Sequence, residues 1–125
     1  MGLVLDSGAL IGFERGDREV AALIEATRRR REPVITSSGC VAQVWRGGPT
    51  QALVARLLRG IREQGLDSEV SRQIGRLCGE AGSNDVVDAH VALLAHDHDV
   101  VLTSEAADLR RLLRTGGSTA QVQSC

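Results

Sequence analysis

The fold is decided by the stretch Leu3-Val4-Leu5-Asp6-Ser7-Gly8. Three consecutive apolar residues are typical of a short strand that is buried on both faces, as in a parallel sheet. Ser7 and Gly8 then offer a tight exit into a helix. Ligands of open α/β sheets collect outside the carboxyl ends of the strands, so Asp6 is expected at a binding site. A buried carboxylate there needs a cation or a set of hydrogen bonds to balance it.

Strand-like and helix-like segments alternate along the rest of the chain. Strands are expected at residues 3–5, 33–36 and 99–103, with weaker ones at 61–66 and 118–123. Helices are expected at 9–14, after Asp17, after Ser37 or Ser38, from Thr50, after Asp67 or Ser68, after Asp85, and at 105–114. This alternation predicts one α/β domain over residues 1–125, a parallel sheet of four or five strands with helices on both faces.

Composition narrows the class of protein. A chain of 125 residues is long enough for one core but too short for two domains. Its 15 basic and 16 acidic residues give a formal net charge of −1, which provides no overall attraction for nucleic acid. The three cysteines have neither disulfide nor zinc spacing, which favours a reducing cytoplasm. No apolar stretch is long enough to span a membrane.

Acidic residues recur beside the predicted strand ends. Asp85 and Asp88 are three residues apart at the beginning of a helix, and Glu105 and Asp108 repeat that spacing after another strand. Side chains three residues apart share a helix face, so these acids and Asp6 are expected to converge on one crevice. A negative charge in the first turn of a helix also interacts favourably with the helix dipole, without any metal. This explains the positions of Asp85 and Glu105 as well as metal binding does.

Two of these acids are expected to hold a metal. Asp88 lies on the apolar side of its helix, so it should point inward, where a carboxylate needs a metal or an arginine as its partner. Asp6 has the same requirement. We therefore expect Asp6 and Asp88 to bind a divalent metal ion. The expected catalytic residues are Asp6, Asp88, Glu105, Asp108 and Asp85.

Four motifs together resemble a PIN domain, above all the VapC-like ribonuclease toxins of bacterial toxin–antitoxin pairs. They are Leu3–Leu10, Val44-Trp45-Arg46-Gly47, Asn84–Ala89 and Leu102–Leu109. The resemblance covers nearly the whole chain and implies a Rossmann-like sheet and metal-dependent cleavage of RNA. It also implies a homodimer and a cognate antitoxin that blocks the crevice. The family's first acid falls on Asp6, its third on Asp88, and its fourth acidic region on Glu105 and Asp108.

The chain departs from the family's pattern at the second acid. Such proteins commonly carry glutamate where this chain has Gln43, and aspartate where it has Glu105. Glutamine offers a carbonyl oxygen but no charge, so Mg²⁺ should bind more weakly. Two alternatives stay open: a ribonuclease, and a degenerate PIN domain that binds RNA or an antitoxin without cutting. A receiver-like domain with a phosphorylated Asp6 is disfavoured, because the chain has no lysine.

Cationic and aromatic residues supply the remaining candidates. Arg15, Arg46 and Arg110 are candidate phosphate contacts, and ion pairs with the acids are an equal alternative for each. Trp45 is expected to pack inside the protein or in a subunit interface rather than against a base. The histidines are expected on a solvated surface; they are His90, His96 and His98.

Overall fold

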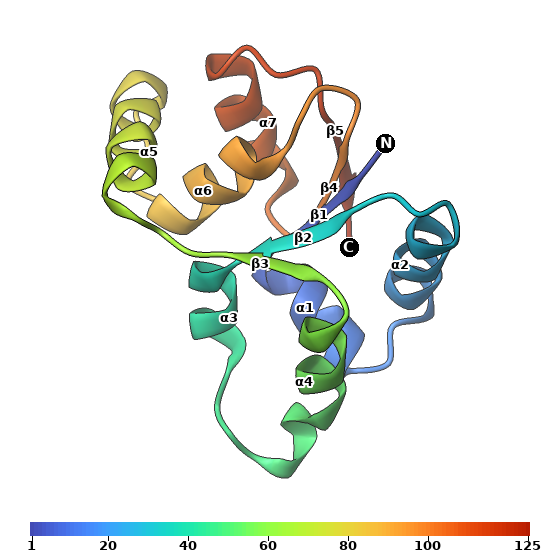
Figure 1. Ribbon diagram of the computed structural model, residues 1–125. Coiled ribbons are helices and arrows are strands. Elements are labelled where there is room, and N and C mark those ends of the chain that lie inside the picture. The colour runs from blue at the N-terminus through green and yellow to red at the C-terminus, as the bar shows by residue number, and fades with distance from the viewer.

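In the computed structural model, which describes all 125 residues, five parallel strands form one sheet (Figure 1). The strands are β1 (Leu3–Leu5), β2 (Val34–Ser37), β3 (Arg62–Gln64), β4 (Val100–Thr103) and β5 (Gln121–Ser124). Their spatial order is β3-β2-β1-β4-β5. The chain therefore builds the sheet outward from β1 in one direction, then returns and adds β4 and β5 on the other side. The expected α/β architecture is confirmed.

The helices form a layer on each face of this sheet. They are α1 (Ser7–Glu14), α2 (Arg18–Arg29), α3 (Ser38–Val44), α4 (Ala52–Arg59), α5 (Ser68–Ala81), α6 (Val86–Leu94) and α7 (Ala106–Thr115). Figure 1 shows α5, α6 and α7 together on one side and α1 to α4 on the other. No helix is long and apolar enough to cross a membrane.

Short polar side chains start most of the helices, because they accept hydrogen bonds from backbone N–H groups that have no partner within the helix. The structure confirms Asp17 and Asp85 as N-caps and selects Ser37 over Ser38 and Asp67 over Ser68. The helix expected from Thr50 begins with a 3-10 turn, Pro49–Gln51, before α4.

The weaker strand predictions are confirmed with shifted ends. The edge strand expected at 61–66 is reduced to β3, and all three of its residues are exposed. The last strand, expected at 118–123, is β5 and begins three residues later, at Gln121. By contrast, β1 is completely buried between the two helix layers, as its apolar run predicts.

Candidate active site at the carboxyl edge of the sheet

Strands β1 and β4 lie side by side at the centre of the sheet, and we call the edge formed by their carboxyl ends the crevice. The chain leaves β1 into α1 on one face of the sheet and leaves β4 into α7 on the other. Adjacent parallel strands whose connections diverge in this way leave an opening at their carboxyl ends, the usual ligand site of such sheets. Asp6 follows β1 at this point, and the segment from Thr103 to Glu105 ends β4 beside it.

Asp6 is held in one orientation by hydrogen bonds from both sides of the crevice. Its side chain is 3% exposed, and its Oδ1 accepts a hydrogen bond from Ala9 N at 2.9 Å as the N-cap of α1. Its Oδ2 accepts from Ser104 N at 3.2 Å and from the Thr103 hydroxyl. The Thr103 hydroxyl in turn accepts from Glu105 N at 2.8 Å. The β4–α7 turn therefore fixes a carboxylate that belongs to β1.

Asp88 has a buried oxygen without a partner. The residue is 7% exposed, which confirms the inward direction predicted from its helix face, and its Oδ2 is the one buried side-chain polar atom that lacks a hydrogen bond. Burial, and after it the negative charges of four further acids, together raise the pKa of its carboxyl group from 3.8 to about 7. In order of effect these acids are Asp85, Asp6, Glu105 and Asp108. Because charges interact measurably only at short range, each of these four acids lies near enough to Asp88 for its charge to act on that carboxyl group.

No protein cation compensates this cluster. The ion pairs of the structure join the Met1 amino group to Glu32 and Arg29 to Glu25, all outside the crevice. The sequence analysis left an arginine open as the partner of Asp6 or Asp88. Neither residue forms an ion pair with one. Five neighbouring acids without a counter-charge are costly to keep ionised, and the raised pKa of Asp88 reflects that cost.

The candidate phosphate-binding arginines lie at three separate places. Arg15 is exposed at the C-cap of α1. Arg46 is exposed just beyond α3, where its Nη1 donates to the Trp45 carbonyl oxygen at 2.8 Å. Arg110 lines a hollow of about 450 Å³ over α7 and β5. None forms an ion pair with an acid.

Asp85, Glu105 and Asp108 differ in the hydrogen bonds that their side chains make. Asp85 caps α6, where its Oδ1 accepts from Asp88 N at 2.9 Å, so its expected role in the helix turn is confirmed. Glu105 stands at the cap position of α7 without making a side-chain cap bond, and Asp108 is exposed in the first turn of that helix. Both are therefore free to face the crevice.

The chemistry of the donor set fits a hard cation that keeps water. No three His, Cys, Asp or Glu side chains are grouped closely enough to hold an ion among themselves. Mg²⁺ does not need such a cage, because it is commonly bound through one or two carboxylates and retains several waters. The unpartnered Oδ2 of Asp88, in a region of uncompensated negative charge, is a suitable donor for such an ion.

Gln43 lies at the margin of the crevice. The hydroxyl of Ser7, the residue after Asp6, donates a hydrogen bond to Gln43 Oε1. This bond engages one of the two lone pairs of the Gln43 carbonyl oxygen, and the amide nitrogen of Gln43 is left as a donor.

The surface location predicted for His90 is wrong. His90 is 1% exposed, and its Nδ1 lies 2.6 Å from Ser37 Oγ. Ser37 Oγ also accepts from Gly39 N at 3.0 Å, and burial lowers the pKa of the His90 imidazole. The sequence held a signal for this burial: α6 is apolar on both sides of His90. Thr103 and Gly8, which also shape the site, were not predicted to do so.

No family model and no curated protein matches this sequence. Among solved structures, the chain is similar to the crystal structure of VapBC2 from Rickettsia felis bound to a DNA fragment from their promoter. The TM-score is 0.72 at 12% sequence identity, and the match covers 100% of this chain and 99% of that chain. At this identity the likeness concerns the fold alone. The five-stranded parallel sheet and its two helix layers are therefore an arrangement that this chain shares with a chain of that structure.

Proposed function

We propose that this protein is a metal-dependent ribonuclease and the toxin of a toxin–antitoxin pair. The observation that carries the proposal is the buried, unpartnered oxygen of Asp88, whose carboxyl group feels the charges of four other acids and has no cation paired with it. Carboxylates arranged in this way attract a divalent ion, and an ion at this edge is well placed to meet the phosphate of a bound strand.

The residues of the crevice have distinct roles in this proposal. Asp88 Oδ2 and Asp6 would hold Mg²⁺ or Mn²⁺, and the ion when bound would supply Lewis acidity and a water of lowered pKa. Thr103 and Ser104 keep Asp6 in one orientation through their hydrogen bonds to its Oδ2. The exposed acids of the crevice would orient the attacking water through their carboxylates; they are Asp85, Glu105 and Asp108.

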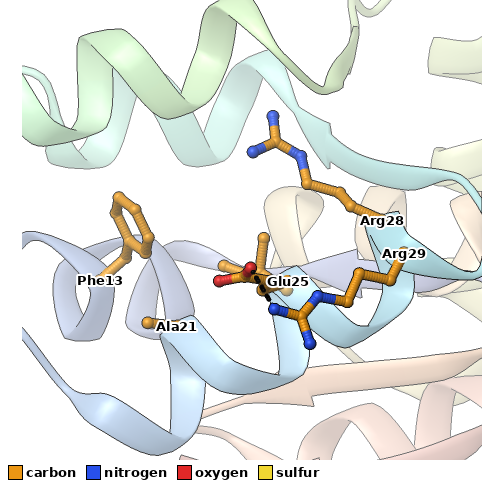
Figure 2. A pocket seen from close by; sticks show the side chains of 6 residues that line it. Phe13, Ala21, Glu25, Arg28 and Arg29 are labelled. Carbon is orange, nitrogen blue, oxygen red and sulfur yellow. Dashed lines mark hydrogen bonds and ion pairs between the residues drawn. The ribbon is translucent and has the colours of Figure 1, made fainter.

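An antitoxin would need a surface of this protein on which to dock. We assign it to a hollow beside α1 and α2. This hollow of about 520 Å³ is lined by Phe13, Ala21, Ile24, Glu25, Arg28 and Arg29. Figure 2 shows the Phe13 ring at one end and the two arginines at the other, with Arg29 paired to Glu25 at 3.0 Å. An apolar floor with a cationic rim suits a peptide that carries both apolar and acidic side chains. The homodimer implied by the family resemblance stays a prediction.

The test of catalysis is RNA cleavage by the purified protein and by Asp6→Asn, with Mg²⁺ or Mn²⁺. We expect the wild type to cut RNA and Asp6→Asn to lower the rate by about 100-fold, because the neutral amide weakens the ion site at its best-ordered ligand. The substitution keeps the size of the side chain, and circular dichroism serves as the folding control. Equal rates in both proteins would identify a contaminating nuclease or a different site.

The second candidate is a degenerate domain that binds RNA or an antitoxin without cutting, and the engaged oxygen of Gln43 favours it. Gln43→Glu would add a charge beside Asp6 while the Ser7 hydroxyl can still donate to a carboxylate oxygen. We expect this variant to cleave RNA about tenfold faster than the wild type. Gln43→Ala is the matched control and should not accelerate cleavage. If the wild type is inactive with either ion and Gln43→Glu is active, the degenerate alternative is correct.

A further inference from the structure

Trp45 presents an exposed aromatic face in a chain with only one other aromatic residue, Phe13. Trp45 is 43% exposed, so the expected packing inside the protein accounts for only part of the side chain. Leaving so much indole surface in water is unfavourable unless another molecule covers it. Trp45 therefore offers part of an aromatic side chain that a bound molecule can cover.

The backbone around Trp45 is fixed by a buried glutamine. Gln51 is 5% exposed, and its Oε1 accepts from Arg46 N and from Gly47 N, the latter at 3.2 Å. Its Nε2 donates to Glu14 Oε1 at 2.9 Å, which anchors the loop to the end of α1. Trp45 N also donates to Val41 O at 2.8 Å. The backbone that carries the indole is thus held by hydrogen bonds before anything binds. This reduces the conformational entropy that the loop would lose on binding.

The indole stands one short helix away from the carboxylate cluster. The helix α3 begins directly after β2 at the carboxyl edge of the sheet, and Gln43 in its last turn bonds to Ser7 beside Asp6. Trp45 directly follows this helix, and a helix of seven residues is about 10 Å long. Arg46, exposed beside Trp45, adds a guanidinium group at this position.

We propose that Trp45 is a stacking platform for an unpaired base of the RNA strand whose backbone crosses the carboxylate cluster; this rests on the proposed ribonuclease function. The cluster itself repels phosphate, and the net charge of −1 provides no long-range attraction. Stacking is independent of charge and tolerates any base, because every base has a π-face. Trp45 would therefore supply the affinity that the acids oppose, and Arg46 would contact a neighbouring phosphate.

Because Trp45 is the single tryptophan, its fluorescence reports on this site alone. In an Asp6→Asn background with Mg²⁺, which slows cleavage enough for a titration, we expect a single-stranded RNA dodecamer to quench the emission as a base stacks on the indole. An abasic ribose-phosphate dodecamer is the matched probe, and it should leave the emission unchanged because it has phosphates and no bases.

Two sets of variants separate stacking from a structural role. With Asp6 restored, Trp45→Ala should raise KM for single-stranded RNA by about 5- to 100-fold with little change in kcat, and Trp45→Phe should recover most of the loss. A tryptophan moved elsewhere is the control for non-specific quenching. Leu93 is 37% exposed at the far end of α6, so in Trp45→Phe/Leu93→Trp RNA should leave the emission unchanged.

Three results would overturn the inference. RNA that leaves Trp45 emission unchanged, or equal quenching by the abasic oligomer, would show that no base stacks there. Emission that depends on protein concentration and not on RNA would mean that a second copy of the chain covers the indole. Absence of cleavage by the wild type, with quenching intact, would count against the ribonuclease and not against the platform.

Discussion

Asp88→Asn is expected to raise the free energy of unfolding by on the order of 3 to 4 kcal/mol at about pH 8 in the absence of divalent ions, and to leave it nearly unchanged at about pH 4. The cause is the carboxyl group of Asp88, whose pKa rises from 3.8 to about 7, first through burial and then through the four acids around it. A neutral amide of the same shape avoids the cost of placing a charge there.

The sign follows from proton binding. The unfolded chain releases the Asp88 proton near its ordinary pKa of 3.8, whereas the folded protein keeps it until about pH 7. Between these values the folded state binds more protons, so this group makes the wild type less stable as the pH rises through that window. His90 acts in the opposite direction, because burial lowers its pKa, but it is present in both proteins and cancels in their difference.

Urea unfolding of both proteins at a series of pH values, followed by circular dichroism in EDTA, measures this difference. A difference independent of pH would contradict the raised pKa of Asp88. Adding Mg²⁺ at about pH 8 provides the matched control for the metal proposal. Because a ligand stabilises the state that binds it, Mg²⁺ should stabilise the wild type and have little effect on Asp88→Asn.

Gly8→Ala is expected to lower the free energy of unfolding by about 3 kcal/mol, because α1 has no room for a methyl group at this position. A Cβ at Gly8 would lie 2.3 Å from Ser104 Oγ and 2.5 Å from Ser104 Cβ, far inside van der Waals contact. Relief requires α1 to move away from the β4–α7 turn. Asp6, which caps α1 and accepts from that turn, would lose its hydrogen bonds.

Two further substitutions make the Gly8 measurement specific. Gly75 lies inside α5, and a Cβ added there would meet nothing within 4 Å, so Gly75→Ala should stabilise the protein by about 0.5 to 1 kcal/mol. Gly8→Ala/Ser104→Gly removes both side-chain atoms that the new methyl group would meet and should recover part of the lost stability. If Gly8→Ala behaves like Gly75→Ala in thermal unfolding, the close approach of α1 to Ser104 is not present in solution.

The sequence was sufficient for the parts of the molecule that follow local rules. The apolar run before Asp6 predicts a buried central strand, and acids at helix starts predict N-caps, because both depend on neighbours in the chain. The inward direction of Asp88 follows from helical spacing in the same way. These local rules, with the placement of ligand sites at strand ends, also predict that the five acids share one edge of the sheet.

The parts that could not be predicted depend on contacts between distant segments. His90 was misjudged because its burial depends on Ser37, which lies 53 positions away. Trp45 was expected to be covered because a large apolar side chain usually is, and only the three-dimensional structure reveals the buried Gln51 that keeps its loop outside the core. The need for glycine at position 8 likewise depends on Ser104 and not on any neighbour in sequence.

The central position of β1 beside β4 has a consequence for synthesis on the ribosome. Asp6 leaves the exit tunnel early, whereas Thr103 and Ser104, which orient it, are separated from it by 97 and 98 positions. A nascent chain therefore carries the first acid of the crevice long before the groups that hold it in place exist. The arrangement of Asp6 that the structure shows can therefore form only after Thr103 and Ser104 have also left the ribosome.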